Sequence, residues 1–182
     1  MIRAIDESSR SAGQLLDHAM VNFRADQFQT ESIDLRKLMA ETVERLSPTA
    51  ELKDISIITQ DQGGDFDFDC DPILLQNALR NILDNAIKYS PADSDITVTL
   101  ARDAHNHILS IADQGRGFAG ANLSDHLQRF KRGTNVHDIV GSGLGLTIVD
   151  EVARAHGGYV EITNHTDPEG GGACVSLYLP LV

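Results

Sequence analysis

The sequence predicts an α+β fold: a two-layer sandwich in which helices pack on one face of a β-sheet, preceded by an N-terminal α-helix. Two observations predict it. Segments with strand character outnumber those with helical character, and neighbouring strand segments follow one another as hairpins. The expected division is a helical segment at residues 1–28 and a single domain at residues 29–182.

The N-terminal segment has the residue spacing of a helix that packs against another helix. Apart from the polar Ser9, residues three and four positions apart are apolar: Ile2, Ile5, Ala12, Leu16, Ala19 and Phe23. One helix cannot bury such a stripe alone. We expect it to form a homodimer, with packing on the chain's own domain as the alternative. His18 lies between apolar positions, where a histidine is usually structural or solvated.

The remaining elements follow from apolar periodicity and from turn residues. Helices are expected at 36–46, at 72–89, briefly at 123–130 and after Gly145. The second of these has Asp71 as its N-cap and Pro72 in its first turn. A turn is expected at Gly170–Gly172 and a hairpin through 103–106. The expected strands are 32–35, 55–59, 65–69, 96–100, 107–111, 159–163 and 173–179.

Composition excludes several classes of function. A formal net charge of −12 argues against a nucleic-acid partner, which would require a basic face. The two cysteines, Cys70 and Cys174, are far apart and fit a reduced, cytoplasmic compartment. No apolar run approaches the roughly 18 residues of a membrane span, and no signal peptide opens the chain.

A glycine-rich stretch at residues 141–146 directly precedes an expected helix. Three glycines within five residues bury nothing in a core, but they allow backbone amides to approach a ligand closely. The first amides of a helix have no internal partner, and the helix dipole favours negative charge there. The stretch therefore predicts a phosphate site. Its residues are Gly141, Ser142, Gly143, Leu144, Gly145 and Leu146.

The helix expected at 72–89 carries two asparagines on one face. Asn81 and Asn85 are four residues apart, beside an apolar stripe. Asparagine is a poor helix former, whereas amide oxygens suit Mg²⁺ that also contacts phosphate. Lys88 and Tyr89 lie one turn further on, within reach of a phosphate and of a base or ribose. The alternative is that both asparagines are merely solvated.

A third candidate is Asp113, which ends an apolar strand. Its carboxylate could accept a hydrogen bond from an exocyclic amine such as that of adenine, and Gly115 and Gly117 would allow the backbone to turn beside the ligand. Residues 115–120 also match the dinucleotide fingerprint G-x-G-x-x-G. A Rossmann unit would require a parallel β-α-β segment here, and the polar, poorly periodic stretch that follows argues against it.

The fourth candidate is a basic segment, Arg129-Phe130-Lys131-Arg132-Gly133, in an otherwise acidic chain. It predicts a local anion clamp, with a solvated basic turn as the alternative. The chain contains no G-x-x-x-x-G-K-[ST] motif, so the phosphate site is not a P-loop.

Together these motifs resemble the N, G1, F and G2 boxes of sensor histidine kinases. Their order and approximate spacing also match, and the resemblance covers about residues 33–180. It implies the Bergerat ATP-binding fold. The matching stretches are Asn81-x-x-x-Asn85-Ala-x-Lys88-Tyr89, Asp113-x-Gly115-x-Gly117, Arg129-Phe130-x-Arg132-Gly133 and Gly141-x-Gly143-Leu-Gly145-Leu.

The resemblance implies ATP and Mg²⁺ as cofactors. Asn85, assisted by Asn81, would hold the metal, and Asp113 would read the adenine amino group. An ATP lid would span about 119–142. The residues implied to bind the nucleotide are Asn81, Asn85, Lys88, Tyr89, Asp113, Gly115, Gly117, Phe118, Arg129, Arg132, Gly141, Ser142, Gly143, Leu144, Gly145 and Leu146; those implied in catalysis are Asn81, Lys88 and Arg132.

Asn81 also separates relatives within the resembled fold. ATPases such as gyrase, heat-shock chaperones and mismatch-repair proteins carry a glutamate there as general base for water. An asparagine amide cannot accept that proton at neutral pH. The chain is therefore expected to bind MgATP, to hydrolyse it poorly and to pass the γ-phosphoryl group to a histidine on a separate helix.

The chain also departs from a complete histidine kinase. No histidine is followed by an acidic residue and a nearby proline, and His18 lacks that context. By resemblance, residues 1–28 are the second helix of a dimerisation hairpin, so the chain is expected to be an incomplete kinase. The implied partners are the phosphoacceptor helix and a response-regulator receiver domain, and an inner-membrane sensor is a candidate for the parent protein. The alternatives are a non-catalytic, nucleotide-gated interaction module, an ATPase of the same fold and, less favoured, an anti-sigma type serine kinase.

Overall fold

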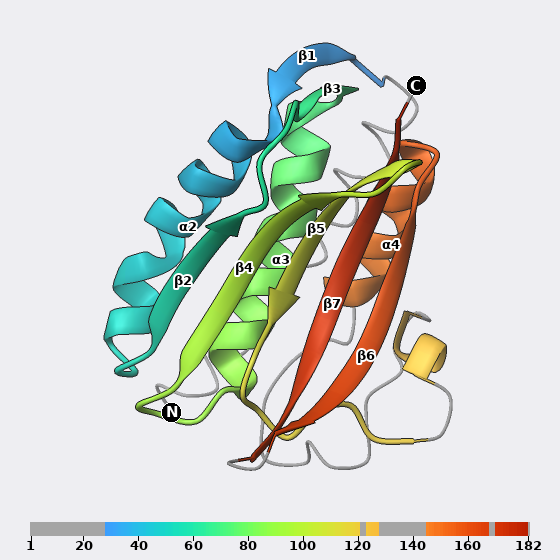
Figure 1. Cartoon of the computed structure of the whole chain (residues 1–182). Coiled ribbons are helices and arrows are strands. Elements are labelled where there is room, and N and C mark those ends of the chain that lie inside the picture. Colours follow the sequence, from blue (N-terminus) through green and yellow to red (C-terminus); the bar gives the residue numbers. More distant parts are fainter. Residues whose placement is uncertain (1–27, 121–122, 128–144, 168–169, 182) are drawn as a thin grey trace, which may run out of the picture.

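The computed structural model describes residues 28–120, 123–127, 145–167 and 170–181 (Figure 1). The expected helix at 1–28 therefore lies almost entirely outside the described residues. The described elements are β1 (Glu31–Asp34), α2 (Leu35–Glu51), β2 (Ser56–Asp61), β3 (Asp67–Cys70), α3 (Pro72–Tyr89), β4 (Asp95–Arg102), β5 (Asn106–Ala112), the 3₁₀-helix η1 (Leu123–Leu127), α4 (Gly145–Ala155), β6 (Tyr159–Asp167) and β7 (Gly170–Pro180).

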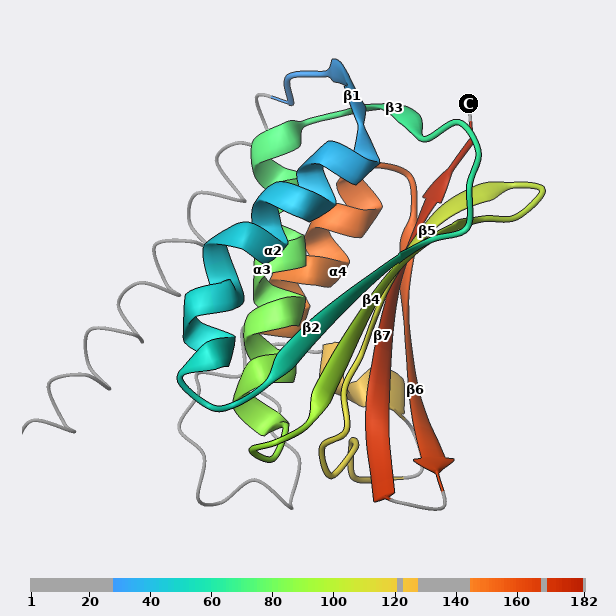
Figure 2. The same cartoon turned by 60° about the vertical axis from the view of Figure 1, so that its left-hand side comes forward.

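These elements form two layers, which confirms the predicted fold class. One layer is a five-stranded sheet in the order β2-β4-β5-β7-β6, and the other consists of α2, α3 and α4 on one face of that sheet (Figure 2). The strands β1 and β3 form a separate antiparallel pair. Among the described residues, no helix is long and apolar enough to cross a membrane.

Strand pairing confirms part of the predicted hairpin topology. β4 and β5 form the expected hairpin, and β6 pairs antiparallel with β7. The expectation was wrong for β2 and β3, because β3 leaves the main sheet and α3 crosses over to β4. β2 and β4 therefore run parallel, with Ile57 opposite Ile96.

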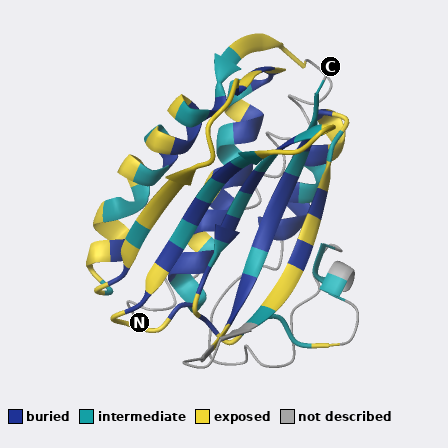
Figure 3. Ribbon diagram, viewed as in Figure 1, coloured by how far each residue is buried: buried dark blue, intermediate teal, exposed yellow. Residues whose placement is uncertain are grey.

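The core lies between the helices and the inner face of the sheet. Burial alternates along β4, where Ile96, Val98 and Leu100 are buried and the residues between them are not (Figure 3). Burying one such side chain contributes about 1.5–3 kcal/mol. The helices supply the opposing apolar residues, among them Leu75, Leu79 and Ile82 of α3 and Ile148, Val149 and Val152 of α4.

Helix α2 is longer than the 36–46 predicted. It begins at Leu35, because Asp34 caps it by accepting a hydrogen bond from the Arg36 amide. It also continues through Pro48 to Glu51. The proline ring is exposed, and the buried Ala50 packs into the core beyond it, so packing outweighs the missing amide.

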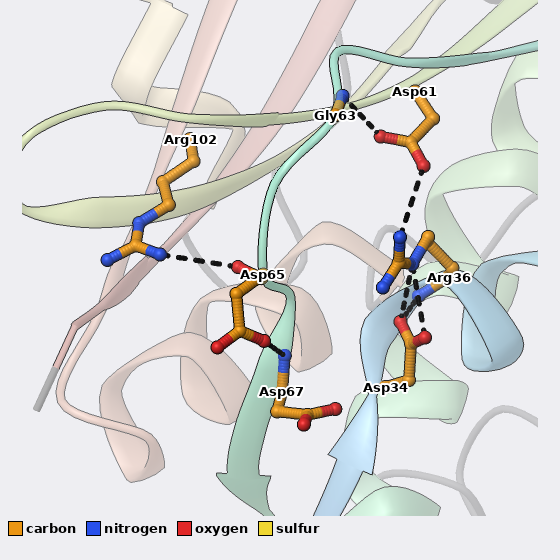
Figure 4. A network of polar contacts seen from close by, with 7 residues as sticks. All are labelled: Asp34, Arg36, Asp61, Gly63, Asp65, Asp67 and Arg102. Carbon is orange, nitrogen blue, oxygen red and sulfur yellow. Dashed lines mark hydrogen bonds and ion pairs between the residues drawn. The ribbon is translucent and has the colours of Figure 1, made fainter.

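Two arginines link neighbouring elements at the surface around the end of β2 and the segment that follows it (Figure 4). Arg36 contacts Asp34 at 3.0 Å and Asp61 at 3.8 Å, and Arg102 donates to the Asp65 backbone oxygen. The guanidinium lowers the pKa of Asp34 through its hydrogen bond. The paired side chains are partly open to solvent, so these contacts orient the surface and contribute little stability.

The glycines at 170–172 form part of β7, and the prediction of a turn there was wrong. Asp167 pairs with Gly170, and His165 pairs with Gly172. A side chain at Gly172 would overlap the Asp113 carbonyl oxygen and would lie 2.5 Å from the His165 ring. Glycine is therefore required by a close approach of strands rather than by a change of direction.

Candidate functional site

Helix α3 positions the two asparagines of the candidate site. Asp71 caps its first turn as predicted, accepting hydrogen bonds from the Ile73 and Leu74 amides. Asn81 is 8% exposed, and its Nδ2 donates to the Asn77 carbonyl at 2.8 Å. Among the described residues, Asn81 Oδ1 accepts no hydrogen bond. This side chain is therefore held in place with an amide oxygen available.

The start of α4 packs directly against these amides. A Cβ atom built on Gly145 would lie 3.3 Å from both Asn81 Oδ1 and Asn85 Nδ2. Two predicted stretches, 64 residues apart in the chain as counted from Asn81 to Gly145, thus meet at the N-terminal end of a helix. Leu146 is buried in the core, so the helix start is fixed there. Gly141, Ser142, Gly143 and Leu144 lie outside the described residues.

The C-terminal end of α3 carries the predicted Lys88 and Tyr89. Lys88 Nζ lies 5.3 Å from the centroid of the Tyr89 ring. A residue that the sequence did not single out supports this end: Lys53 Nζ donates to the carbonyls of Ile87, Lys88 and Ser90 at 2.7, 3.1 and 2.9 Å. Burial lowers the pKa of Lys53. Its charge nevertheless suits the negative end of the helix dipole.

Asp113 extends β5 and is 9% exposed. Its Oδ1 accepts hydrogen bonds from the Gly115 amide at 2.8 Å and the Ala173 amide at 3.3 Å. Burial raises the pKa of Asp113, and these two amides oppose the shift. Within the described part of the chain, Oδ2 accepts no hydrogen bond. One carboxylate oxygen is thus used to fix the group, and the other remains for a ligand.

The turn after Asp113 depends on both predicted glycines. A side chain at Gly115 would lie 2.7 Å from the Tyr89 carbonyl oxygen, so this turn packs on the end of α3. Gly117 has a φ of +68°, which L side chains rarely adopt. Phe118 follows, partly buried, and its ring lies 5.0 Å from that of His126.

Part of the predicted lid at 119–142 is described. Of the predicted helix at 123–130, residues 123–127 form the 3₁₀-helix η1, and 128–130 lie outside the described residues. His126 Nε2 donates to the Ala119 carbonyl. Thr147 of α4 donates to the Leu127 carbonyl at 3.2 Å. Figure 1 shows η1, the start of α4 and the end of α3 at the same end of the molecule. Arg129 and Arg132 lie outside the described residues.

The donor set indicates which ligand this arrangement can hold. Among the described residues, no group of three or more histidine, cysteine or carboxylate side chains could hold a metal. The candidate side chains are two amides that meet at the start of α4 and one buried carboxylate whose turn packs on the end of α3. This combination suits an anion with a hard, largely hydrated cation at one end and a hydrogen-bond donor at the other.

The contacts of Asn164 and His165 were not anticipated from the sequence. Asn164 contacts the backbone of Phe118, and His165 Nε2 contacts the Asp113 carbonyl at 2.9 Å. Asn164 stands in the sequence as part of an Asn-x-Thr tripeptide, which gives no indication of this contact.

The chain is similar to proteins of a known family. The profile described as histidine kinase-, DNA gyrase B- and HSP90-like ATPase matches residues 70–182. The chain is 35% identical over 97% of its length to a probable sensor histidine kinase HK of Mycobacterium tuberculosis, strain CDC 1551 / Oshkosh, and covers 45% of that protein. It is 34% identical to the sensor protein QseC of Salmonella typhi, over 92% of this chain and 36% of that one.

A solved structure gives the same picture. The mycobacterial sensor histidine kinase MprB superposes with a TM-score of 0.73 at 30% identity, covering 84% of this chain and 97% of that chain. The chain therefore spans less than half the length of the curated relatives cited, and nearly all of the MprB chain in that structure.

Proposed function

Because the chain belongs to the histidine kinase-, DNA gyrase B- and HSP90-like ATPase family, we propose that it is the ATP-binding catalytic domain of a two-component sensor histidine kinase. It would transfer the γ-phosphoryl group of ATP to a histidine on a separate helix, for relay to an aspartate of a receiver domain. This reaction would take place in the cytoplasm, with residues 1–28 as a helix of the dimerisation hairpin and 29–182 as the catalytic domain. The lid would span about 119–142.

The observation that carries the proposal is the convergence of Asn81, Asn85 and Gly145. The amides of a helix start would bind phosphate oxygens, and the two side-chain amides face the same point. Asn81 Oδ1 and the Asn85 amide fit Mg²⁺, which would neutralise charge on the phosphates when bound. At the other end of the site, Asp113 Oδ2 would accept a hydrogen bond from the adenine amino group.

The asparagine at position 81 argues against water as the acceptor of the phosphoryl group. An enzyme that transfers phosphate to water needs a base beside the phosphates, and an uncharged amide cannot serve. Asn81 is also already bonded through Nδ2 to the Asn77 carbonyl, which holds its side chain and leaves Oδ1 for the metal. Catalysis would then rest on orientation of the phosphates and on charge stabilisation by Lys88 and Arg132.

Titration calorimetry tests binding first. We expect MgATP to bind, binding to weaken when Mg²⁺ is chelated, and steady-state hydrolysis to be slow. Asn85→Ala should remove most of the Mg²⁺ dependence, whereas Asn77→Ala, two turns upstream on the same helix, should not. Rapid hydrolysis would contradict the proposal and favour an ATPase.

Phosphotransfer needs a second assay. The chain is joined to the preceding helix of its own parent protein, and acid-labile phosphohistidine is measured with γ-labelled ATP. Label on that helix supports kinase activity. ATP binding without any label would instead identify a nucleotide-gated interaction module.

A further inference from the structure

Three strands place Asp113, Ala173 and Asn164 in one row across the end of the sheet. The Asp113 amide donates to the Ala173 carbonyl at 2.8 Å, and Ala173 pairs with Asn164 in the β6–β7 register. The residue that would read the base is therefore two strands away from Asn164. The segment from Asp113 to Phe118 follows β5 and forms no regular strand of its own.

The Asn164 side chain supplies hydrogen-bond partners for the backbone of this segment, which in the described part of the chain has no neighbouring strand to pair with Phe118. Its Oδ1 accepts from the Phe118 amide at 2.8 Å, and its Nδ2 donates to the Phe118 carbonyl at 2.7 Å. One amide group thus pairs with both backbone groups of a single residue, as a neighbouring strand would. The fit is close, because a Cβ on Gly117 would lie 2.8 Å from Asn164 Oδ1.

His165 holds the other end of the segment. Its Nε2 lies 2.9 Å from the Asp113 carbonyl oxygen, and because a carbonyl only accepts, this nitrogen carries the hydrogen. Gly172 makes room for the ring, since a Cβ there would lie 2.5 Å from it. Two consecutive residues of β6 therefore fix both ends of the Asp113–Phe118 segment.

We propose that Asn164 and His165 are positioning residues for base recognition, holding the Asp113–Phe118 segment so that Asp113 Oδ2 faces the amino group of an adenine. This inference rests on the proposed function, and it adds residues that contact the recognition segment rather than the nucleotide. It predicts that both residues act on the base-dependent part of affinity and not on the phosphate-dependent part.

The test measures binding of MgATP, MgGTP and magnesium tripolyphosphate to the full chain and its variants. Asn164→Ala should weaken MgATP binding about tenfold, the value expected for two lost neutral hydrogen bonds, and should lower the ATP-to-GTP affinity ratio. The affinity of Asn164→Ala for tripolyphosphate, which has no base, should be within about twofold of that of the parent chain. Thr163→Ala, the exposed preceding residue on β6, is the matched control and should change none of the three affinities.

His165 gives a second, independent variant pair. His165→Ala should lower the ATP-to-GTP ratio, and His165→Gln, which retains an N–H donor, should restore much of it. Circular dichroism verifies that each variant is folded.

The outcomes separate the two proposals. Equal weakening of all three ligands, or an unchanged ATP-to-GTP ratio, overturns the role of Asn164 and His165. If Asp113→Ala reduces ATP binding while both β6 variants do not, the positioning role fails and the nucleotide site stands. If Asp113→Ala leaves ATP binding unchanged, base recognition itself fails.

Discussion

Two buried aspartates, Asp71 and Asp113, lie at opposite ends of the domain, and each is joined to a histidine. The Asp71 amide donates to His156 Nε2 at 3.0 Å, whereas the Asp113 carbonyl accepts from His165 Nε2. Asp71 uses both carboxylate oxygens within the protein: Oδ1 caps α3 and Oδ2 accepts from the Gln29 amide. Asp113 uses only Oδ1 among the described residues.

The difference teaches that burial alone does not mark a binding residue. Asp71 is the more buried of the two, at 0% against 9% exposed. Its acceptor capacity is taken up by backbone amides, which makes it a structural cap. Asp113 is fixed by two amides and retains an oxygen, which in the proposed site would accept a hydrogen bond from the ligand.

The largest expected effect is a loss of stability when Asp71 is substituted. Asp71→Ala should lower the free energy of unfolding by about 2–4 kcal/mol, because α3 loses its cap and buried amides lose an acceptor. Urea denaturation measures this change. The exposed Asp69→Ala serves as control and should change stability little. An Asp71→Ala protein as stable as the parent would show that the cap is dispensable.

Two tightly placed glycines distinguish the ends of the domain. A Cβ on Gly172 would overlap the Asp113 carbonyl oxygen, and one on Gly158 would overlap the Tyr178 carbonyl oxygen. Gly172→Ala and Gly158→Ala should therefore each destabilise the protein by about 1–3 kcal/mol. Only Gly172→Ala should weaken MgATP binding by the folded protein, as measured by calorimetry at low temperature. Equal effects of both substitutions on binding would contradict a local role of Gly172.

Substitution of Asp113 should lower ligand affinity strongly and change stability little. In Asp113→Asn the amide oxygen can keep the Gly115 and Ala173 amides, which turns the NH₂ group toward the ligand. We expect MgATP affinity to fall about 10- to 100-fold, with a change in unfolding free energy below about 1 kcal/mol. A large loss of stability with unchanged affinity would place Asp113 in the same class as Asp71.

The pH dependence of stability should be the smallest effect. Burial lowers the pKa of His156 and of His107, whose ring contacts those of Phe66 and Phe68. Both histidines then contribute stability above about pH 6.5, the value for the unfolded chain, and this stability is lost as the pH falls through their folded values. The raised pKa of Asp113 acts in the opposite direction, because the stability that it contributes is lost as the pH rises through its folded value.

Urea midpoints between pH 5 and pH 8 measure this effect. His156→Gln should flatten the curve below about pH 6.5. A parent protein equally stable across this range would contradict the assignment.

Local chemistry explains what could be predicted from the sequence. The ends of α3 follow from Asp71-Pro72 and from Pro91, which act within a few residues. The strand pairings of β2 and β3 could not be predicted, since they depend on where the crossover through α3 places the chain. The glycines of β7 were mistaken for a turn because their constraint comes from Asp113, about 60 residues away.

The same division applies to the candidate site. Asn81, Asn85 and Asp113 were predicted as site residues from motifs in which the residue types themselves carry the chemistry. Asn164 and Lys53 were not, because their partners lie 46 and 34–37 residues away in sequence. A side chain that hydrogen-bonds to backbone atoms can have almost any residue type as its partner, so the sequence does not reveal such a contact.

The way that α3 is fixed at both ends has a consequence for binding entropy. Asp71 closes its first turn, and the Lys53 ammonium closes its last. The backbone that carries Asn81 and Asn85 is therefore fixed when the protein folds, and the Asn81 amide is also held by the Asn77 carbonyl, so a ligand does not have to order it again. Preorganisation of this kind raises affinity by lowering the entropy lost on association, without any additional contact to the ligand.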